Sequence, residues 1–446
     1  MKDRKIKVYD NGLKLVYKRT KSREAVYFDI RFHSGLKNDP DDKLGLAHFV
    51  EHSVGFSNNK YTKPQKNEFR MKLFYANFAT SRSGMSFYAY IADEEFEETF
   101  AHFINNLTDF NISDEEFENE KKVIKQEILR FRQNLAHETS DTISETIYKQ
   151  KNIRVHSFGT VETVENITKT DLEEYIKDCF TLSNCQITVY GNVSYCKVKR
   201  LIKKYVLSSF PVSSNRKFLK PYEEISYTDY TPKMVVNPSP DEGKSAVRVV
   251  HRLHLKDIDR YRTYATSIIN SIIETAAREY FRDKYGLSYS QGVAIHAVTS
   301  LDKTHQVLNV ETRVDCDEKV VKTVLEVLPK FYQALEKYEI NDDSVKKTKT
   351  TLRIYEKVSP GKNIIQLGER LADCEFAENI YYTDRENKIF NKKKQKISVD
   401  YVKDIFKQAF TRKPFIFVIS NTKDELPQYE DLCKEIAKNS KWINKI

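Results

Sequence analysis

The second half of this chain repeats the first half, and that repeat restricts the possible folds more than any other feature of the sequence. Residues 316–357 carry the pattern of two consecutive amphipathic helices, and residues 94–131 carry the same pattern at an offset of about 228 positions. The later stretch VDYVKDIFKQAF, followed by PFIFVISNT, likewise matches DLEEYIKDCF followed by NCQITVYGNV. Self-similarity over so long a period indicates a duplicated domain rather than a solenoid of short units.

Each half mixes strand and helix patterns. Residues 5–17 alternate apolar and polar side chains on both sides of an Asn-Gly pair, which is typical of a hairpin with a two-residue turn. Further strands are predicted within 25–35 and 73–93, before the helices of 94–131. We therefore predict an α+β fold of two homologous duplicated domains, each a mostly antiparallel sheet packed with helices.

A chain of 446 residues is too long for one ordinary hydrophobic core, which favours separate domains. The stretch from about 208 to 231 is rich in Ser, Pro and other polar residues and has no periodicity, so we place the linker there. The predicted organisation is an N-terminal domain at 1–210, a linker at 211–231 and a homologous C-terminal domain at 232–446.

Composition and charge argue against several classes of protein. The net charge of +10 is spread along the whole chain without a concentrated basic patch, so no nucleic-acid partner is expected. No stretch approaches the roughly 18 apolar residues of a membrane span, and the polar, alternating N-terminus does not resemble a signal peptide. The six cysteines have no paired spacing that would indicate a disulfide framework. We therefore expect a cytoplasmic protein without membrane insertion.

The segment GLAHFVEHSVGF holds the strongest sign of chemistry. His48 and His52 are four residues apart, so on a helix their imidazoles lie one turn apart on the same face, with Glu51 beside the second. Two imidazoles near a carboxylate suit zinc, and a catalytic zinc site needs one more protein ligand and a place for water. The order His-x-x-Glu-His inverts the common metalloprotease motif. Other histidines, including His156, have no matching spacing and are interpreted as structural.

Two further carboxylates lie on the second predicted helix of the first half. Glu120 and Glu127 are seven residues apart and flank an apolar stripe formed by Phe117, Ile124 and Ile128. A charged side chain beside a buried stripe is costly unless it is paired or binds a cation. By themselves, the two glutamates are more simply interpreted as side chains at the solvent rim of the helix.

Taken together, the HFVEH segment, the duplicated halves and the Glu-x6-Glu helix resemble the pitrilysin/insulinase family of zinc peptidases, in its shorter branch of proteins similar to mitochondrial processing peptidases. The resemblance covers nearly the whole chain. It implies that Glu127, 75 residues beyond His52, is the third zinc ligand and that Glu120 supports the site. At the matching offset the second half has Ala-Ala-Arg-Glu-Tyr at 276–280, so one Zn2+ per chain is expected.

The resemblance also implies residues that act on the substrate. The family uses an Arg and a Tyr seven residues apart in its second half, and FRDKYGLSYS supplies Arg282 and Tyr289 at that separation. Both would donate hydrogen bonds to the carbonyl region of the substrate and to the developing oxyanion. A peptide substrate would bind as an added β-strand along the segment of Asn77, Phe78, Ala79 and Thr80.

These residues lead to the hypothesis of a zinc-dependent endopeptidase that hydrolyses peptides or unfolded and leader segments inside a closed chamber. Glu51 would be the general base toward zinc-bound water and would later protonate the leaving amine. Relatives with fused halves imply a homodimer here, or a heterodimer with a related chain, in which Arg282 and Tyr289 complete the zinc site of the other subunit. The alternative is a non-catalytic peptide-binding or scaffold subunit of the same fold.

Overall fold

The computed structural model contains two compact units. The first consists of Met1–Arg130, Gln150–Lys220 and Pro360–Asp384, and the second of Phe131–Lys149, Pro221–Ser359 and Arg385–Ile446. The residues that the structure describes are 4–20, 25–57, 62, 64, 65, 67, 71, 73, 75–211, 233–236, 244–255, 260–288, 290–299, 306–336, 338, 340–358, 364–376, 384–410, 414–420 and 425–439.

The first unit is built on a sheet with the strand order β1-β2-β6-β3-β5-β4. The predicted hairpin joins β1 to β2, and Gly12 in its turn has a φ of 88°, which glycine adopts without strain. Neighbouring strands are antiparallel except β2 and β6. The strands are β1 (Lys5–Val8), β2 (Lys14–Arg19), β3 (Ala25–Phe32), β4 (Tyr75–Thr80), β5 (Met85–Ala92) and β6 (Cys185–Gly191).

Helices cover one face of this sheet and bury the aromatic side chains of its central strands. The ring of Phe28 on β3 packs edge-on against three rings of α3, those of Phe96, Phe100 and Phe103. Spacings of four and three residues place these rings on one helix face, as the sequence pattern predicted. The helices in this part of the sequence are α1 (Leu46–His52), α3 (Phe96–Thr108), α4 (Asp114–Arg132), α6 (Lys151–Arg154), α7 (Val161–Glu165), α8 (Lys169–Cys179) and α9 (Tyr195–Leu201).

The second unit has a sheet with the order β7-β11-β8-β10-β9, in which β7 and β11 are parallel and the other neighbours are antiparallel. Its strands are β7 (Lys233–Val236), β8 (Lys244–Leu255), β9 (Ser290–Thr299), β10 (Gln306–Asp317) and β11 (Phe415–Ser420). The helices in this part of the sequence are α10 (Arg260–Ala277), α11 (Val321–Glu336), α12 (Asp342–Val358), α14 (Asp384–Lys393), α15 (Val399–Phe410) and α16 (Leu426–Asn439).

The two sheets match strand by strand. The run β2-β6-β3-β5-β4 of the first sheet corresponds to β7-β11-β8-β10-β9 of the second, and the parallel pair occupies the same place in both. The predicted α+β fold, with duplicated and mostly antiparallel sheets, is therefore confirmed. None of the helices in the described part of the chain combines the length and the apolar character that crossing a bilayer requires.

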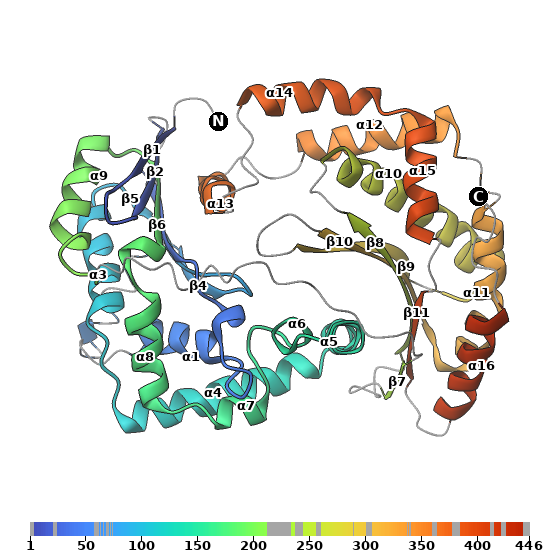
Figure 1. Cartoon of the computed structure of the whole chain (residues 1–446), viewed down its shortest axis with the longest axis horizontal. Helices are drawn as coiled ribbons and strands as arrows, with labels where there is room; N and C mark the ends of the chain where they lie inside the picture. The colour runs from blue at the N-terminus through green and yellow to red at the C-terminus, as the bar shows by residue number, and fades with distance from the viewer. Residues whose placement is uncertain are drawn as a thin grey trace. The chain divides into compact units, whose positions relative to one another are not determined.

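Each unit also contains one helix from the other half of the sequence. Helix α13 (Ile364–Phe376) packs on the first sheet, on the face opposite α3 and α9 (Figure 1). There the Nε2 of Gln186 on β6 donates a hydrogen bond of 3.0 Å to the carbonyl of Ala372. Helix α5 (Leu135–Ile147) contacts β11 in the second unit. Neither unit is therefore a single contiguous stretch of the sequence, because α13 and α5 each belong to the unit formed mainly by the other half.

The domain boundaries at 1–210 and 232–446 stay a prediction of where the duplicated halves lie along the sequence. The predicted linker at 211–231 lies, apart from Pro211, outside the described residues.

Candidate metal centre

Helix α1 carries the His-x-x-Glu-His segment and is held at its N-terminal end. Gly45, just before the helix, has a φ of 99°. The buried carboxylate of Asp39 accepts hydrogen bonds from the backbone N–H groups of Gly45, at 2.8 Å, and Ala47, at 3.1 Å. These are donors that the first turn of a helix leaves unpaired. A helix of seven residues is not stable alone, so such contacts fix where α1 lies.

Two stacked phenylalanines set α1 against α4. The rings of Phe49 and Phe117 have centroids 5.0 Å apart and planes only 12° from parallel. Glu120 and Glu127 follow Phe117 on α4 at spacings of three and ten residues, which correspond to about one and three turns. The two carboxylates therefore lie on the side of α4 that faces α1.

The ligand atoms of His48, His52 and Glu127 all lie within 4.8 Å of one another. The Oε2 of Glu127 is 3.9 Å from the Nε2 of His48 and 3.5 Å from the Nε2 of His52. Nitrogen and oxygen ligands bind zinc at about 2.0–2.2 Å, so two ligands of a tetrahedral ion are about 3.3–3.5 Å apart. The distances from Glu127 lie near this range, so the three side chains could supply three of the four ligands of such an ion.

Two more of the predicted site residues lie beside this group. The Oε2 of Glu120 is 3.2 Å from the Nδ1 of His52, the ring nitrogen that faces away from Glu127. A carboxylate at that nitrogen fixes the orientation and tautomer of a metal-binding histidine. Glu51 is only 5% exposed and accepts a hydrogen bond of 2.7 Å from the hydroxyl of Thr80.

The two histidines differ in protonation. Burial, with a smaller contribution from His52, lowers the pKa of His48 to about 3, so His48 is neutral at pH 7. Burial alone would also lower the pKa of His52, but hydrogen bonds with Glu120 and Glu127 outweigh it and raise that pKa to about 9. His48 can therefore bind a metal directly, whereas a metal must displace a proton from His52.

The surroundings of the two carboxylates near the histidines shift their pKa values in opposite directions. Burial raises the pKa of Glu51, against the opposing effect of the hydrogen bond from Thr80. For Glu127, the hydrogen bond with His52 lowers the pKa and outweighs the opposing effect of partial burial. A raised pKa suits a group that takes up and releases protons, and a lowered pKa suits a ligand that stays anionic.

The structure adds two residues that ligand spacing did not reveal. The ring of Phe158 packs on His48, with centroids 4.7 Å apart, and on His156, at 4.1 Å. The charge of His156 adds a smaller contribution to the lowered pKa values of His48 and Glu127. The interpretation of His156 as structural stays a prediction. A local signal existed in Gly159, whose φ of 76° allows this loop to lie against the backbone before α1.

The predicted peptide-binding segment is strand β4, which forms one edge of the first sheet among the described residues. Its side chains alternate: Asn77 and Ala79 are exposed, whereas Phe78 and Thr80 are half-buried. The Nδ2 of Asn77 donates a hydrogen bond of 3.3 Å to the hydroxyl of Tyr88 on β5. The segment thus has two different faces, and the side chain of Thr80 contacts Glu51.

The predicted Arg/Tyr pair belongs to the second half of the sequence. Arg282 is exposed and lies in the π-helical turn Arg278–Lys284 of the second unit, whereas the metal group lies in the first unit. Tyr289 lies outside the described residues. The role of the pair therefore stays a prediction.

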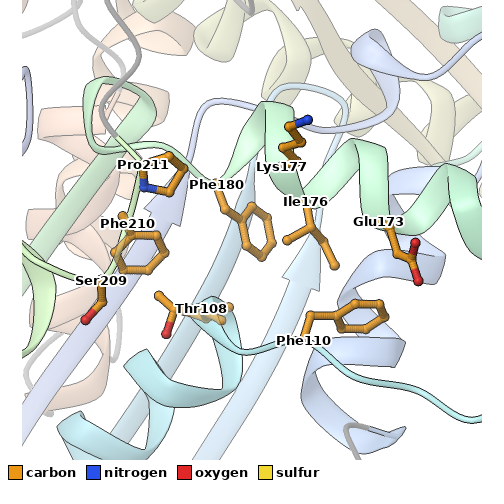
Figure 2. A pocket seen from close by; sticks show the side chains of 10 residues that line it. Thr108, Phe110, Glu173, Ile176, Lys177, Phe180, Ser209, Phe210 and Pro211 are labelled. Atoms are coloured by element: carbon orange, nitrogen blue, oxygen red, sulfur yellow. The ribbon is translucent and has the colours of Figure 1, made fainter.

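A cavity of about 270 Å³ lies elsewhere in the first unit, between α3, α8 and residues 209–211 (Figure 2). Its walls are mainly apolar and include Phe110 and Phe180, and its charged lining residues are Glu173 and Lys177. None of the residues that line it belongs to the metal group. The acids, bases and ligands described above therefore make up a separate site.

Two family models match the chain and together cover more than half of it. One, described as "Insulinase (Peptidase family M16)", matches residues 14–161, a range that includes the whole metal group. The other, described as "Peptidase M16 inactive domain", matches residues 166–352.

The chain is 24% identical over 233 residues to the probable mitochondrial-processing peptidase subunit beta of Arabidopsis thaliana. The matched region covers 52% of this chain and 44% of that protein. It is 23% identical over 194 residues to the uncharacterized zinc protease YmxG of Bacillus subtilis, covering 43% of this chain and 47% of that protein. Its fold is similar to that of the periplasmic protease PqqL from Escherichia coli, with a TM-score of 0.78, 17% identity, and coverage of 99% of this chain and 50% of that chain. These matches span about half the length of each relative.

Proposed function

The chain belongs to the insulinase family of peptidases, family M16, and from this premise we propose that it is a zinc-dependent endopeptidase acting on peptides or unfolded segments. The observation that carries the proposal is the group of His48, His52 and Glu127, with Glu51 one residue before the second histidine. Their spacing suits a tetrahedral zinc ion, and the acid beside it is placed to serve as a base.

Each residue of the site has one task in this reaction. A zinc ion bound there supplies a Lewis acid that polarises a water and the carbonyl of the peptide bond. Glu51 takes a proton from the attacking water and passes it to the nitrogen of the leaving amine. Glu120 keeps the Nε2 of His52 directed at the ligand group by holding its Nδ1.

Strand β4 supports a substrate that binds in an extended conformation. Within the described residues β4 has a strand neighbour only on one side, so its other side can form backbone hydrogen bonds with an added strand. Main-chain bonds recognise many sequences, which fits the hydrolysis of varied peptides. An unfolded or leader segment can take up the extended conformation without first unfolding, so such segments are the expected substrates.

Cleavage of a quenched peptide library by the purified protein tests the proposal. We expect one zinc per chain, cleavage that a chelator abolishes, and recovery when zinc is returned. Glu51→Gln should keep the zinc and lose about 10²–10⁴-fold in kcat, because only the proton transfer is removed. A protein that binds these peptides without zinc and without cutting them would instead support the alternative of a non-catalytic peptide-binding subunit.

We further propose that Arg282 and Tyr289 of a neighbouring subunit, in a homodimer or a heterodimer with a related chain, donate hydrogen bonds to the carbonyl oxygen as its charge develops. The exposed position of Arg282 in the second unit supports this. Chains with His48→Ala and chains with Arg282→Ala are each expected to be inactive. A mixture with random pairing should recover about a quarter of the wild-type activity. Heterodimers that form and stay inactive would contradict the arrangement.

A further inference from the structure

Strand β4 contacts the metal-binding helix at two points. Thr80 and Phe78 lie two residues apart and so share one face of the strand. The hydroxyl of Thr80 donates to the Oε2 of Glu51 at 2.7 Å. Gly55 lies in the π-helical turn Ser53–Ser57, which continues α1. A Cβ on Gly55 would lie 2.4 Å from the ring of Phe78, so a larger side chain there would clash with that ring. Because both contacts are close, the strand and the helix hold each other in register.

The contact at Thr80 restrains a carboxylate that is otherwise surrounded by buried groups. Glu51 is 5% exposed, and the hydroxyl of Thr80 donates a hydrogen bond to its Oε2. A glutamate side chain has several rotamers, and a donor fixed on a hydrogen-bonded strand selects among them. General-base catalysis requires the carboxylate to lie within hydrogen-bond reach of the proton it takes up, so this selection matters for turnover.

We propose that Thr80 is a positioning residue for Glu51 and that its side chain does not bind the peptide. The inference rests on the proposed function, in which a peptide adds to the free side of β4. The strand then has two tasks: its backbone holds the substrate, and its last residue holds the base. Substrate and base are placed by the same rigid element, which fixes the peptide bond relative to the carboxylate.

Three substitutions test the role of Thr80. Thr80→Val keeps the shape of the side chain but removes the hydroxyl, and Thr80→Ser keeps the hydroxyl. Thr108→Val, on α3, is the matched control, because the hydroxyl of Thr108 donates only within its own helix, to the carbonyl of Ile104 at 2.8 Å. We expect Thr80→Val to lower kcat about 10–100-fold, as loss of a group that orients a catalytic residue does, with KM and zinc content unchanged. Thr80→Ser should restore most of kcat, and the control should match the wild type.

A measurement without turnover separates positioning from substrate binding. The dissociation constant of a fluorescent peptide for the zinc-free protein should be the same for the wild type and for Thr80→Val. A crystal structure of the zinc-free variant should place the carboxylate of Glu51 in a different rotamer. If valine disturbs the fold, as judged by circular dichroism, Thr80→Ala gives the same comparison.

Three results would overturn the inference: a raised KM with unchanged kcat, weaker peptide binding to the zinc-free variant, or a variant with wild-type kinetics. Each is distinct from failure of the proposed function. That failure is recognised beforehand, from a zinc-loaded wild type that does not cut the library or from a Glu51→Gln variant that cuts it equally well.

Discussion

The two compact units share a strand order but differ in the helix that follows their corresponding strands, β3 and β8. In the first unit α1 buries His48 and Glu51, which are 4% and 5% exposed. In the second unit the buried face of α10 is mainly alanine and isoleucine, including Ile268, Ile272 and Ala276. Within the described residues, only the first unit has three ligand atoms grouped as a metal requires. The fold therefore forms without the polar pair.

The buried polar residues of α1 are expected to make the first unit less stable than apolar residues there would. Burying an ionisable side chain is unfavourable unless hydrogen bonds or a cation compensate for the loss of water. Helix α1 has seven residues where α10 has eighteen, so it depends more on contacts such as those from Asp39 and Phe117. Local rules that are broken in one copy of a duplicated fold point to a functional site.

The largest test of this comparison removes the ligand that α4 supplies. Glu127→Gln should weaken zinc binding by on the order of 1,000-fold, equivalent to about 4 kcal/mol, because an anionic ligand is lost. The free energy of unfolding of the metal-free protein should change by less than about 1 kcal/mol, since Glu127 is 40% exposed. Competition with a chromogenic chelator and urea unfolding measure the two quantities. Glu118→Gln, an exposed site on the same helix, is the control; equal zinc affinity in both variants would contradict the assignment.

A smaller effect is expected at Glu120, whose carboxylate contacts the Nδ1 of His52. Glu120→Gln keeps the size of the side chain but removes its charge, so it no longer stabilises the ring in one orientation. Such losses cost about 10–100-fold in metal affinity or activity. Isothermal titration with zinc at constant pH measures the change. A zinc affinity within twofold of the wild type would mean that Glu120 does not orient His52. Its contribution would then be no larger than that of an ordinary surface carboxylate.

Much of this site was predictable because local spacing determines it. His48 and His52 share a helix face by their separation alone, and Glu127 followed from the resemblance to a known family. His156 and the contact of Thr80 with Glu51 were not predictable in this way. Both depend on how a loop and a strand far away in the sequence pack against α1, and no periodicity reports such packing. Tyr289 stays a prediction because it lies outside the described residues.

The fold shows the same division between local and tertiary information. Alternation and helical spacing predicted the strands and the duplicated helices. They did not predict that α13 packs on the first sheet and α5 on the second. An amphipathic helix has an apolar stripe whichever sheet it covers, so its sequence pattern does not determine on which sheet it packs. The partner is selected by specific contacts, such as the hydrogen bond of 2.6 Å from the Nδ2 of Asn309 to the hydroxyl of Tyr148.

A substitution in α13 tests the assignment of that helix to the first unit. A Cβ on Gly368 would lie 2.3 Å from the buried ring of Tyr27 on β3. Gly368→Ala should therefore lower the free energy of unfolding by about 1–3 kcal/mol through overpacking, despite the better helix propensity of alanine. Gly292→Ala on β9 of the second unit is the control, because a Cβ there meets nothing within 4 Å. Equal stability of the two variants in urea unfolding would argue against the close packing of α13 on β3.

The smallest expected effect concerns an ion pair that ties the segment before α1 to α8. The Nζ of Lys43 lies 2.6 Å from the Oδ1 of Asp171. Partial burial opposes the charged form of Asp171, but the hydrogen bonds from Lys43 and Thr168, together with the charge of Lys43, outweigh burial and lower the pKa of Asp171. The hydrogen bond with Asp171 raises the pKa of Lys43. Because the pKa of Asp171 is lowered, the contribution of this carboxylate to the free energy of unfolding is fully present above its unfolded value of 3.8. It is lost as the pH falls through the lower, folded value. Because the pKa of Lys43 is raised, its contribution to the free energy of unfolding is fully present below 10.5 and is lost as the pH rises through the higher, folded value.

Lys43→Met keeps the aliphatic stem and leaves the capping hydrogen bonds of Asp171 with Thr168 in place. The variant should be less stable than the wild type by about 0.5 kcal/mol between pH 5 and pH 9, and the difference should diminish as the pH falls below 3.8. Urea unfolding of both proteins across this range measures it. A difference that does not diminish at all below pH 3.8 would mean that Lys43 stabilises the segment before α1 by packing rather than by charge.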